Sequence, residues 1–139
     1  MTDPDCRYLF VYGTLMSGAR SVLGRAQRLR LARQSDGLGP ASLPQARLYD
    51  LGRYPGAAPS NDIDDIVHGE AVLLSNQHAA LRWLDEYEGY VHGADHNEYE
   101  RTIRQVRLAG GETFDAWVYM LRAAPDARRR LASGRWTGR

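Results

Sequence analysis

The segment from Ser75 to Gly89 constrains the fold more than any other stretch, because it predicts one well-delimited helix. Ser75 and Asn76 offer an N-cap, and residues 77–83 are good helix formers without Gly or Pro. Gly89 is a natural stop, since glycine readily adopts the left-handed conformation that ends many helices. We therefore expect a helix that begins after Asn76 and ends before Gly89.

One acidic residue lies on the apolar face of this helix. Leu81, Leu84 and Glu88 are spaced by three and then four residues, which places them on one face, whereas Asp85 and Glu86 point elsewhere. A carboxylate that is carried inward has two interpretations. It is a structural acid paired with one of the arginines, or burial raises its pKa and makes it a proton acceptor near neutral pH. Periodicity alone leaves both interpretations open.

Composition narrows the classes of function. The 139 residues suit a single domain, and the net charge of +1 gives no reason to expect nucleic acid or a membrane as partner. All 18 basic residues are Arg, which excludes Schiff-base and lysine-nucleophile mechanisms. The single Cys6 excludes an internal disulfide and a zinc site built on several thiolates. Since no apolar stretch is long enough for a signal peptide core or a membrane span, we expect a soluble, cytoplasmic protein.

Most other segments read as strands. The apolar run from Tyr8 to Tyr12 is typical of a strand buried on both faces. Further strands are expected over 45–51, 67–74, 99–108 and 113–121, with a hairpin turn at Gly110-Gly111 and either a bulge or a close approach at Gly69. Weaker patterns favour a short helix over 20–26, a strand over 29–32, loops over 36–40 and 57–65, and a short helix over 125–134. Trp136 is expected to pin the C-terminus to the body of the protein. Without regular strand–helix alternation, an α+β fold with a curled or barrel-like mixed sheet is predicted.

A turn bounded by Gly13 and Gly18 follows the first strand. Such a turn exposes successive backbone N–H groups that form a nest for a carboxylate or phosphate, although an ordinary strand-to-helix turn has the same pattern. Its spacing is not that of a nucleotide-binding loop. His92 and His96 are four residues apart, but Gly93 argues against a helix there, so no metal site is predicted.

Six short motifs together resemble the γ-glutamylcyclotransferase-like family, especially its small members related to γ-glutamylamine cyclotransferase. The motifs are Val11-Tyr12-Gly13-Thr14-Leu15, the run Leu48-Tyr49-Asp50-Leu51-Gly52 with Tyr54-Pro55-Gly56, Val67-His68-Gly69-Glu70, Leu84-Asp85 with Glu88-Gly89, Ala116-Trp117-Val118-Tyr119, and Ser133-Gly134 with Trp136. They occur in this order between Tyr8 and Trp136, which is nearly the whole chain.

The resemblance implies a small β-barrel with flanking short helices and a pocket at its mouth. It implies conversion of a γ-glutamyl-amine or γ-glutamyl-amino acid to 5-oxoproline, with release of the amine and with no metal or organic cofactor. Glu88 matches the family's catalytic acid, and Tyr119 would line the pocket. The loop that holds the glutamyl head group matches four residues, namely Tyr12, Gly13, Thr14 and Leu15.

This chemistry agrees with the residues, because the substrate's own α-amine attacks its γ-carbonyl and no protein nucleophile is needed. A base is needed, since an ammonium cannot attack. The α-amine titrates near about 8 and an ordinary Glu near about 4.3, a mismatch of about 5 kcal/mol that burial of Glu88 would reduce. Backbone N–H groups of Gly13 to Leu15 would bind the α-carboxylate or the developing oxyanion. A non-catalytic binding or regulatory module on the same scaffold, and hydrolysis by activated water, are the alternatives.

Overall fold

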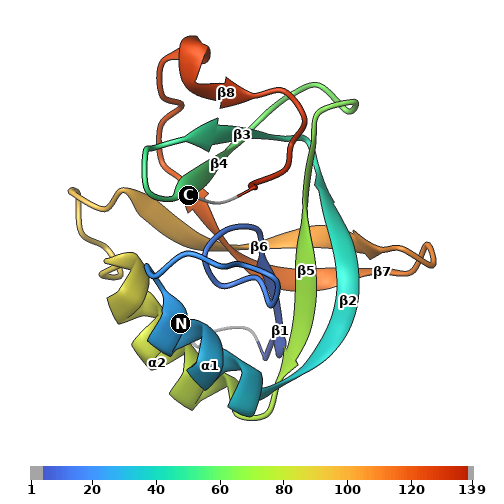
Figure 1. Cartoon of the computed structure of the whole chain (residues 1–139), viewed down its shortest axis with the longest axis vertical. Coiled ribbons are helices and arrows are strands. Elements are labelled where there is room, and N and C mark those ends of the chain that lie inside the picture. The colour runs from blue at the N-terminus through green and yellow to red at the C-terminus, as the bar shows by residue number, and fades with distance from the viewer. Residues whose placement is uncertain (1–4, 138–139) are drawn as a thin grey trace.

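Strands supply most of the regular structure in the computed structural model, which describes residues 5–137. The elements in chain order are β1 (Tyr8–Val11), α1 (Arg25–Arg33), β2 (Ser35–Pro44), β3 (Ala46–Asp50), β4 (Pro55–Pro59), β5 (Ile66–Leu74), α2 (Gln77–Glu88), β6 (Tyr99–Leu108), β7 (Thr113–Leu121), the 3-10 helix η1 (Ala127–Arg129) and β8 (Arg130–Leu131) (Figure 1).

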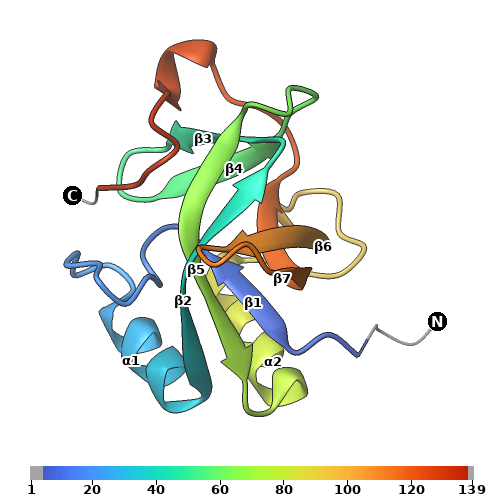
Figure 2. The same cartoon turned by 90° about the vertical axis from the view of Figure 1, so that its right-hand side faces the viewer.

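Five of the described strands close into a mixed barrel. Antiparallel pairs join β1 to β5, β5 to β2, β2 to β6 and β6 to β7, and a parallel contact between β7 and β1 completes the ring. A lobe of β4, β3 and β8 continues from β7, since β4 pairs in parallel with it. Both helices lie at the end of the molecule opposite this lobe (Figures 1 and 2). The prediction of a small mixed barrel with flanking helices is confirmed.

The helix α2 begins and ends where its capping residues predict. The side chain of Asn76 accepts a hydrogen bond from the N–H of Ala79 at 3.1 Å, and Gly89 ends the helix with a φ of 68°. Leu84 is completely buried, so the apolar face packs into the core.

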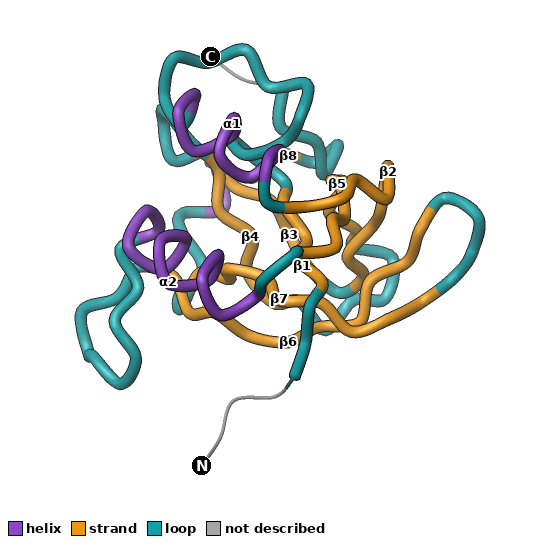
Figure 3. The backbone as a smooth tube through the Cα atoms, turned by 90° about the horizontal axis from the view of Figure 1, so that it is seen from below, coloured by secondary structure: helices purple, strands orange, loops and turns teal. Residues whose placement is uncertain are grey.

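Seen from below, both helices lie to one side, away from the turn that joins β6 and β7 (Figure 3). No helix within residues 5–137 is long and apolar enough to cross a membrane.

The strand β1 is buried on both faces, as its continuous apolar run predicts. Leu9 packs into one apolar cluster and Phe10 into another, on the opposite face of the strand. Gly69 of the neighbouring strand β5 lies so close to β1 that it has no room for a side chain. A Cβ there would overlap the carbonyl oxygen of Val11 and the ring of Phe10. The predicted close approach at Gly69 is therefore confirmed.

The predictions for residues 20–40 are wrong. The chain forms one helix, α1, where a helix over 20–26 and a strand over 29–32 are expected. Residues 36–40, expected as a loop, lie in β2. Their glycines and proline suit a turn, but pairing with β5 along the whole strand, with a register shift between Gly37 and Gly39, satisfies the backbone instead.

The predictions for the lobe are also partly wrong. Residues 55–59 form β4, although a loop is expected from residue 57 onward, because small residues such as Ala57 let β4 fit between β3 and β7. Residues 127–131 form the short 3-10 helix η1 and then β8, where one helix over 125–134 is expected, because β8 pairs with β3. The predicted hairpin of β6 and β7 is confirmed, and its register is continuous from Tyr99 to Arg107.

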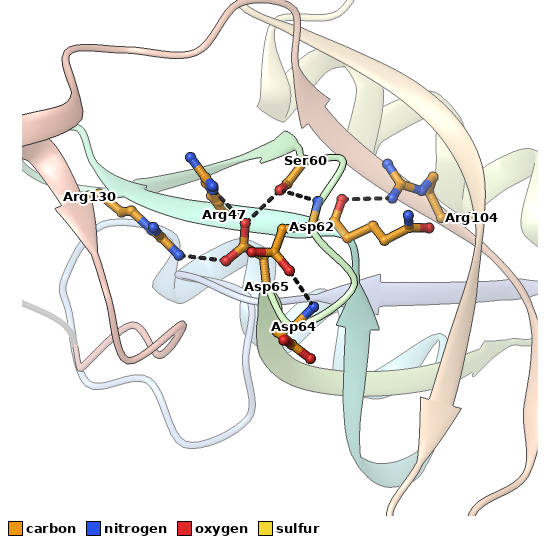
Figure 4. A network of polar contacts seen from close by, with 8 residues as sticks. Arg47, Ser60, Asp62, Asp64, Asp65, Arg104 and Arg130 are labelled. Carbon is orange, nitrogen blue, oxygen red and sulfur yellow. Dashed lines mark hydrogen bonds and ion pairs between the residues drawn. The ribbon is translucent and has the colours of Figure 1, made fainter.

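A charged cluster ties this lobe to the barrel (Figure 4). The buried carboxylate of Asp65, just before β5, accepts hydrogen bonds from Ser60, from Arg47 of β3 and from Arg130 of β8. The bonds from Ser60 and Arg47 lower the pKa of Asp65 to about 2. Trp136 is buried, which confirms that it pins the C-terminal segment.

Candidate active site

A cavity of about 270 Å³ lies at the mouth of the barrel. Its walls come from the end of β1 and the turn after it, the start of β4, the last turn of α2, the start of β6, and β7. All six residues predicted for the site line this cavity, namely Tyr12, Gly13, Thr14, Leu15, Glu88 and Tyr119. The fold thus brings together segments that are more than a hundred residues apart, while the roles of these residues stay predictions.

Glu88 extends into the cavity from the last turn of α2 and is only partly exposed. Desolvation by burial, with smaller contributions from the negative charges of Glu98 and Asp85, raises its pKa to about 7. Among the described residues, no hydrogen bond or ion pair reaches its carboxylate, so the structural ion pair with an arginine is not found. A carboxylate with this pKa can accept and return a proton near neutral pH.

The turn after β1 lines the cavity with three consecutive residues. Gly13, Thr14 and Leu15 are all buried, and their N–H groups donate to no other described residue. A Cβ at Gly13 would lie 2.7 Å from Cγ of Pro55, so a side chain would push these two walls apart. Buried amides without partners are costly, and successive ones in a turn form an anion site. The turn can therefore hold a carboxylate or an oxyanion.

Tyrosines make up much of the remaining wall, from Tyr12, Tyr54, Tyr87, Tyr99 and Tyr119. The hydroxyl of Tyr12 donates to the carbonyl oxygen of Tyr119 at 2.7 Å, and that of Tyr99 donates to the carbonyl oxygen of Pro55 at 2.7 Å. Burial raises the pKa of Tyr12, Tyr99 and Tyr119, so these phenols stay neutral. Tyr12 thus shapes the wall with its ring while its hydroxyl is engaged elsewhere.

A partly buried polar network supports the wall beside Glu88. The hydroxyl of Tyr119 donates to Oδ1 of Asp85 at 2.7 Å, and Arg101 binds the same carboxylate through Nε at 2.8 Å. The guanidinium of Arg101 also lies 4.3 Å from the ring centre of Trp117. This network holds α2 against β6 and β7, and it keeps Asp85 from acting as a free base.

Sequence reasoning missed a second carboxylate at the cavity. Glu98 is exposed, lines the cavity and accepts a hydrogen bond from the hydroxyl of Tyr54 at 2.9 Å. Tyr54 stands in one of the motifs, but Glu98 lies in a polar loop and nothing in its local pattern distinguishes it. Tyr87, also missed, is hydrogen-bonded to Oγ1 of Thr14 at 2.7 Å. No Arg or His side chain is among the described residues that line the cavity.

Comparison with known proteins identifies the family of the chain. The model of the family described as "Gamma-glutamyl cyclotransferase, AIG2-like" matches residues 9–138. The chain is 32% identical over 131 residues to the γ-glutamylcyclotransferase family protein YtfP of Escherichia coli K12, covering 94% of this chain and 96% of that one. The solution structure of E. coli ytfP superposes with a TM-score of 0.59 at 31% identity, over 94% and 96% of the two chains.

Two further solved structures share the fold. An AIG2-like protein from Mus musculus has a TM-score of 0.65 and 25% identity, over 86% of this chain and 80% of that one. A structure titled "Gamma-glutamyl cyclotransferase" has a TM-score of 0.60 at 17% identity, over 82% and 65%, and supports the fold alone. On the family model and the E. coli relative together, the chain belongs to the AIG2-like γ-glutamyl cyclotransferase family.

Proposed function

We propose that this chain is a γ-glutamyl cyclotransferase that converts a γ-glutamyl-amine or γ-glutamyl-amino acid to 5-oxoproline and a free amine. One observation carries the proposal: a carboxylate with a pKa of about 7, that of Glu88, in a small cavity shared with the unpartnered N–H groups of Gly13 to Leu15. Membership of the family supports the reaction class. The partner is then a small molecule, and the reaction uses no metal or organic cofactor.

Glu88 is the general base and then the general acid. Its carboxylate takes a proton from the substrate's α-ammonium, whose pKa is only about one unit higher than the pKa of about 7 of Glu88. The α-amine attacks the γ-carbonyl carbon and forms a tetrahedral intermediate. As the bond to the leaving nitrogen breaks, that nitrogen receives the proton from Glu88. The ring nitrogen then returns a second proton to Glu88, which passes it to the freed amine, so atoms and charges balance.

The turn after β1 binds the glutamyl head group. The substrate's α-carboxylate needs donors, and the unpartnered amides of Gly13, Thr14 and Leu15 supply them. A carboxylate held there and a carbonyl beside Glu88 fold the substrate toward ring closure, which supplies the proximity that cyclisation needs. The neutral tyrosines exclude water from the reacting atoms without competing for the proton.

Product analysis tests this proposal most directly. Incubation of the protein with γ-glutamyl-alkylamines and γ-glutamyl-amino acids should yield 5-oxoproline by mass spectrometry. The substitution Glu88→Gln should lower turnover by at least about 100-fold, since it removes the general base while keeping the shape of the side chain. Glu86 is exposed on the same helix, so Glu86→Gln is a matched control that should keep the wild-type rate.

Each alternative has its own product pattern. Free glutamate in place of 5-oxoproline would identify a hydrolase that activates water. A thermal shift with γ-glutamyl ligands and no product at any pH would identify a binding module. Wild-type turnover in Glu88→Gln would show that Glu88 is not the base.

A further inference from the structure

Two charged side chains hold the turn after β1 from outside the cavity. Arg28 of α1 is half-buried, and its two terminal nitrogens donate to the carbonyl oxygens of Thr14 at 2.7 Å and Ser21 at 3.0 Å. Glu70 of β5 accepts from the backbone N–H of Ser17 and from its hydroxyl, each at 2.7 Å. Neither Arg28 nor Glu70 lines the cavity, so neither can touch a ligand there directly.

The contact from Arg28 determines how one peptide unit is oriented. In a trans peptide the C=O and the N–H of the unit point in opposite directions. Because the carbonyl of Thr14 points to Arg28, the N–H of Leu15 points away from it. In the preceding unit, the carbonyl oxygen of Gly13 accepts a hydrogen bond from the N–H of Met16 at 3.1 Å, so the N–H of Thr14 points away from Met16. The N–H groups of Thr14 and Leu15 are two of the three in this turn that lack a partner.

Arg28 supplies a positive charge next to a cavity whose described lining has none. The described lining of the cavity carries two carboxylates, Glu88 and Glu98, and no cationic side chain, which disfavours an anionic ligand. Arg28 is close enough to the wall to influence Tyr87 electrostatically. A guanidinium bound to the far end of a peptide unit polarises that unit and strengthens its N–H as a donor to an anion.

We infer that Arg28 and Glu70 are positioning residues that hold the turn of Gly13 to Leu15 as a carboxylate cradle. Arg28 acts by orientation and by charge, and Glu70 acts by anchoring the distal end of the turn at Ser17. This assignment rests on the proposed function for the identity of the ligand, the α-carboxylate of a glutamyl group. It explains why Glu70, which stands in a motif but does not line the cavity, binds Ser17 in the first loop of the chain.

A titration followed by NMR tests the cradle without any turnover. The ¹⁵N-labelled protein is titrated with 5-oxoproline and with 2-pyrrolidinone, which is the same ring without the carboxylate. The wild type should bind 5-oxoproline at least about tenfold more tightly, with downfield shifts of the Thr14 and Leu15 amide protons. In Arg28→Met that preference should fall below about threefold, whereas Arg25→Met, an exposed residue of the same helix, should keep it.

Glu70 supplies an independent variant pair. Glu70→Ala removes both bonds to Ser17 and should weaken the preference for 5-oxoproline. Glu70→Gln should keep it, since its amide oxygen accepts from the Ser17 N–H and its amide nitrogen donates to the Ser17 hydroxyl. General damage to the fold would weaken binding of both rings alike, so the ratio of the two affinities isolates the cradle. Arg28→Lys, which keeps the charge and one bond, should give an intermediate ratio.

The outcomes separate this inference from the proposed reaction. A wild type without preference for 5-oxoproline, or Arg28→Met and Glu70→Ala variants that keep the wild-type ratio, would overturn the cradle. A protein that shows the cradle but makes no 5-oxoproline would reject the cyclotransferase and leave the cradle in place. A protein that makes 5-oxoproline with an unaltered ratio in both variants would retain the reaction and reject the positioning roles.

Discussion

The raised pKa of Glu88 has a consequence for the stability of the protein. Its folded-state pKa of about 7 lies above the ordinary value of 4.5, so between these pH values the folded protein binds more protons than the unfolded chain. Stability contributed by the neutral acid is therefore lost as pH rises from about 4.5 to about 7. The same desolvation that suits Glu88 to the proposed role of base thus destabilises the fold at neutral pH.

The substitution Glu88→Gln should therefore stabilise the protein in a pH-dependent way. Gln keeps the side-chain volume and has no charge to bury, so its advantage over the wild type should grow between pH 5 and pH 7.5, by up to a few kcal/mol. Thermal melts at these two pH values measure it. The exposed control Glu86→Gln should show no such trend. An equal difference between wild type and Glu88→Gln at both pH values would contradict the raised pKa.

Glu98 should influence the pH dependence of turnover from the rim of the cavity. Its negative charge contributes to the raised pKa of Glu88, so Glu98→Gln should lower that pKa. In the proposed reaction Glu88 must be deprotonated to act as base, so kcat/KM should rise with pH through this pKa. The acidic limb should therefore move to lower pH. The exposed Glu112, which lies outside the cavity lining, is the control for charge removal, and an unmoved limb in Glu98→Gln would reject the coupling.

At the scale of the elements, β1 and β5 approach each other closely at Gly69, where there is no room for a side chain. A methyl group at Gly69 would overlap the carbonyl oxygen of Val11, which belongs to the paired backbone of β1, and it would also press on the ring of the buried Phe10. Gly69→Ala should therefore lower the free energy of unfolding by about 1–3 kcal/mol or more, measured by urea denaturation. Gly37→Ala in β2, where a Cβ meets open space, should cost far less. Equal losses in the two variants would show that the approach is not tight.

For the whole molecule, the Asp65 cluster links the lobe of β3, β4 and β8 to the barrel (Figure 4). The pKa of Asp65 is lowered to about 2 from 3.8, so its contribution to stability is present above pH 3.8 and is lost as pH falls through about 2. The two arginines that bind Asp65 come from β3 and β8. One carboxylate thus holds three segments together.

Asp65→Asn should lower the melting temperature by several degrees at pH 7, because it leaves Arg47 and Arg130 without their anion. That difference from the wild type should shrink as pH falls from about 4 to about 2, where the wild-type carboxylate also takes up its proton. Asp64→Asn, at the exposed neighbouring position, should melt like the wild type throughout. A constant difference across this pH range would assign the loss to packing and not to charge.

The sequence by itself determined the elements whose signals are local. The caps at Asn76 and Gly89 delimit α2, a 3.6-residue period places Glu88 on its buried face, and a continuous apolar run marks β1. The ordered motifs pointed to the family, and the six predicted residues do meet at one cavity. These inferences succeed because periodicity and capping depend on neighbours within a few residues along the chain.

Only the tertiary structure decided what depends on distant contacts. Residues 36–40 became a strand because β5 supplies partners for their backbone, against the turn preference of their glycines. Glu98 and Tyr54 joined the cavity because closure of the barrel brings β4 and β6 beside α2. The pKa of Glu88 likewise follows from desolvation by these walls and from the charge of Glu98. Such effects act through space, so no local pattern in the sequence records them.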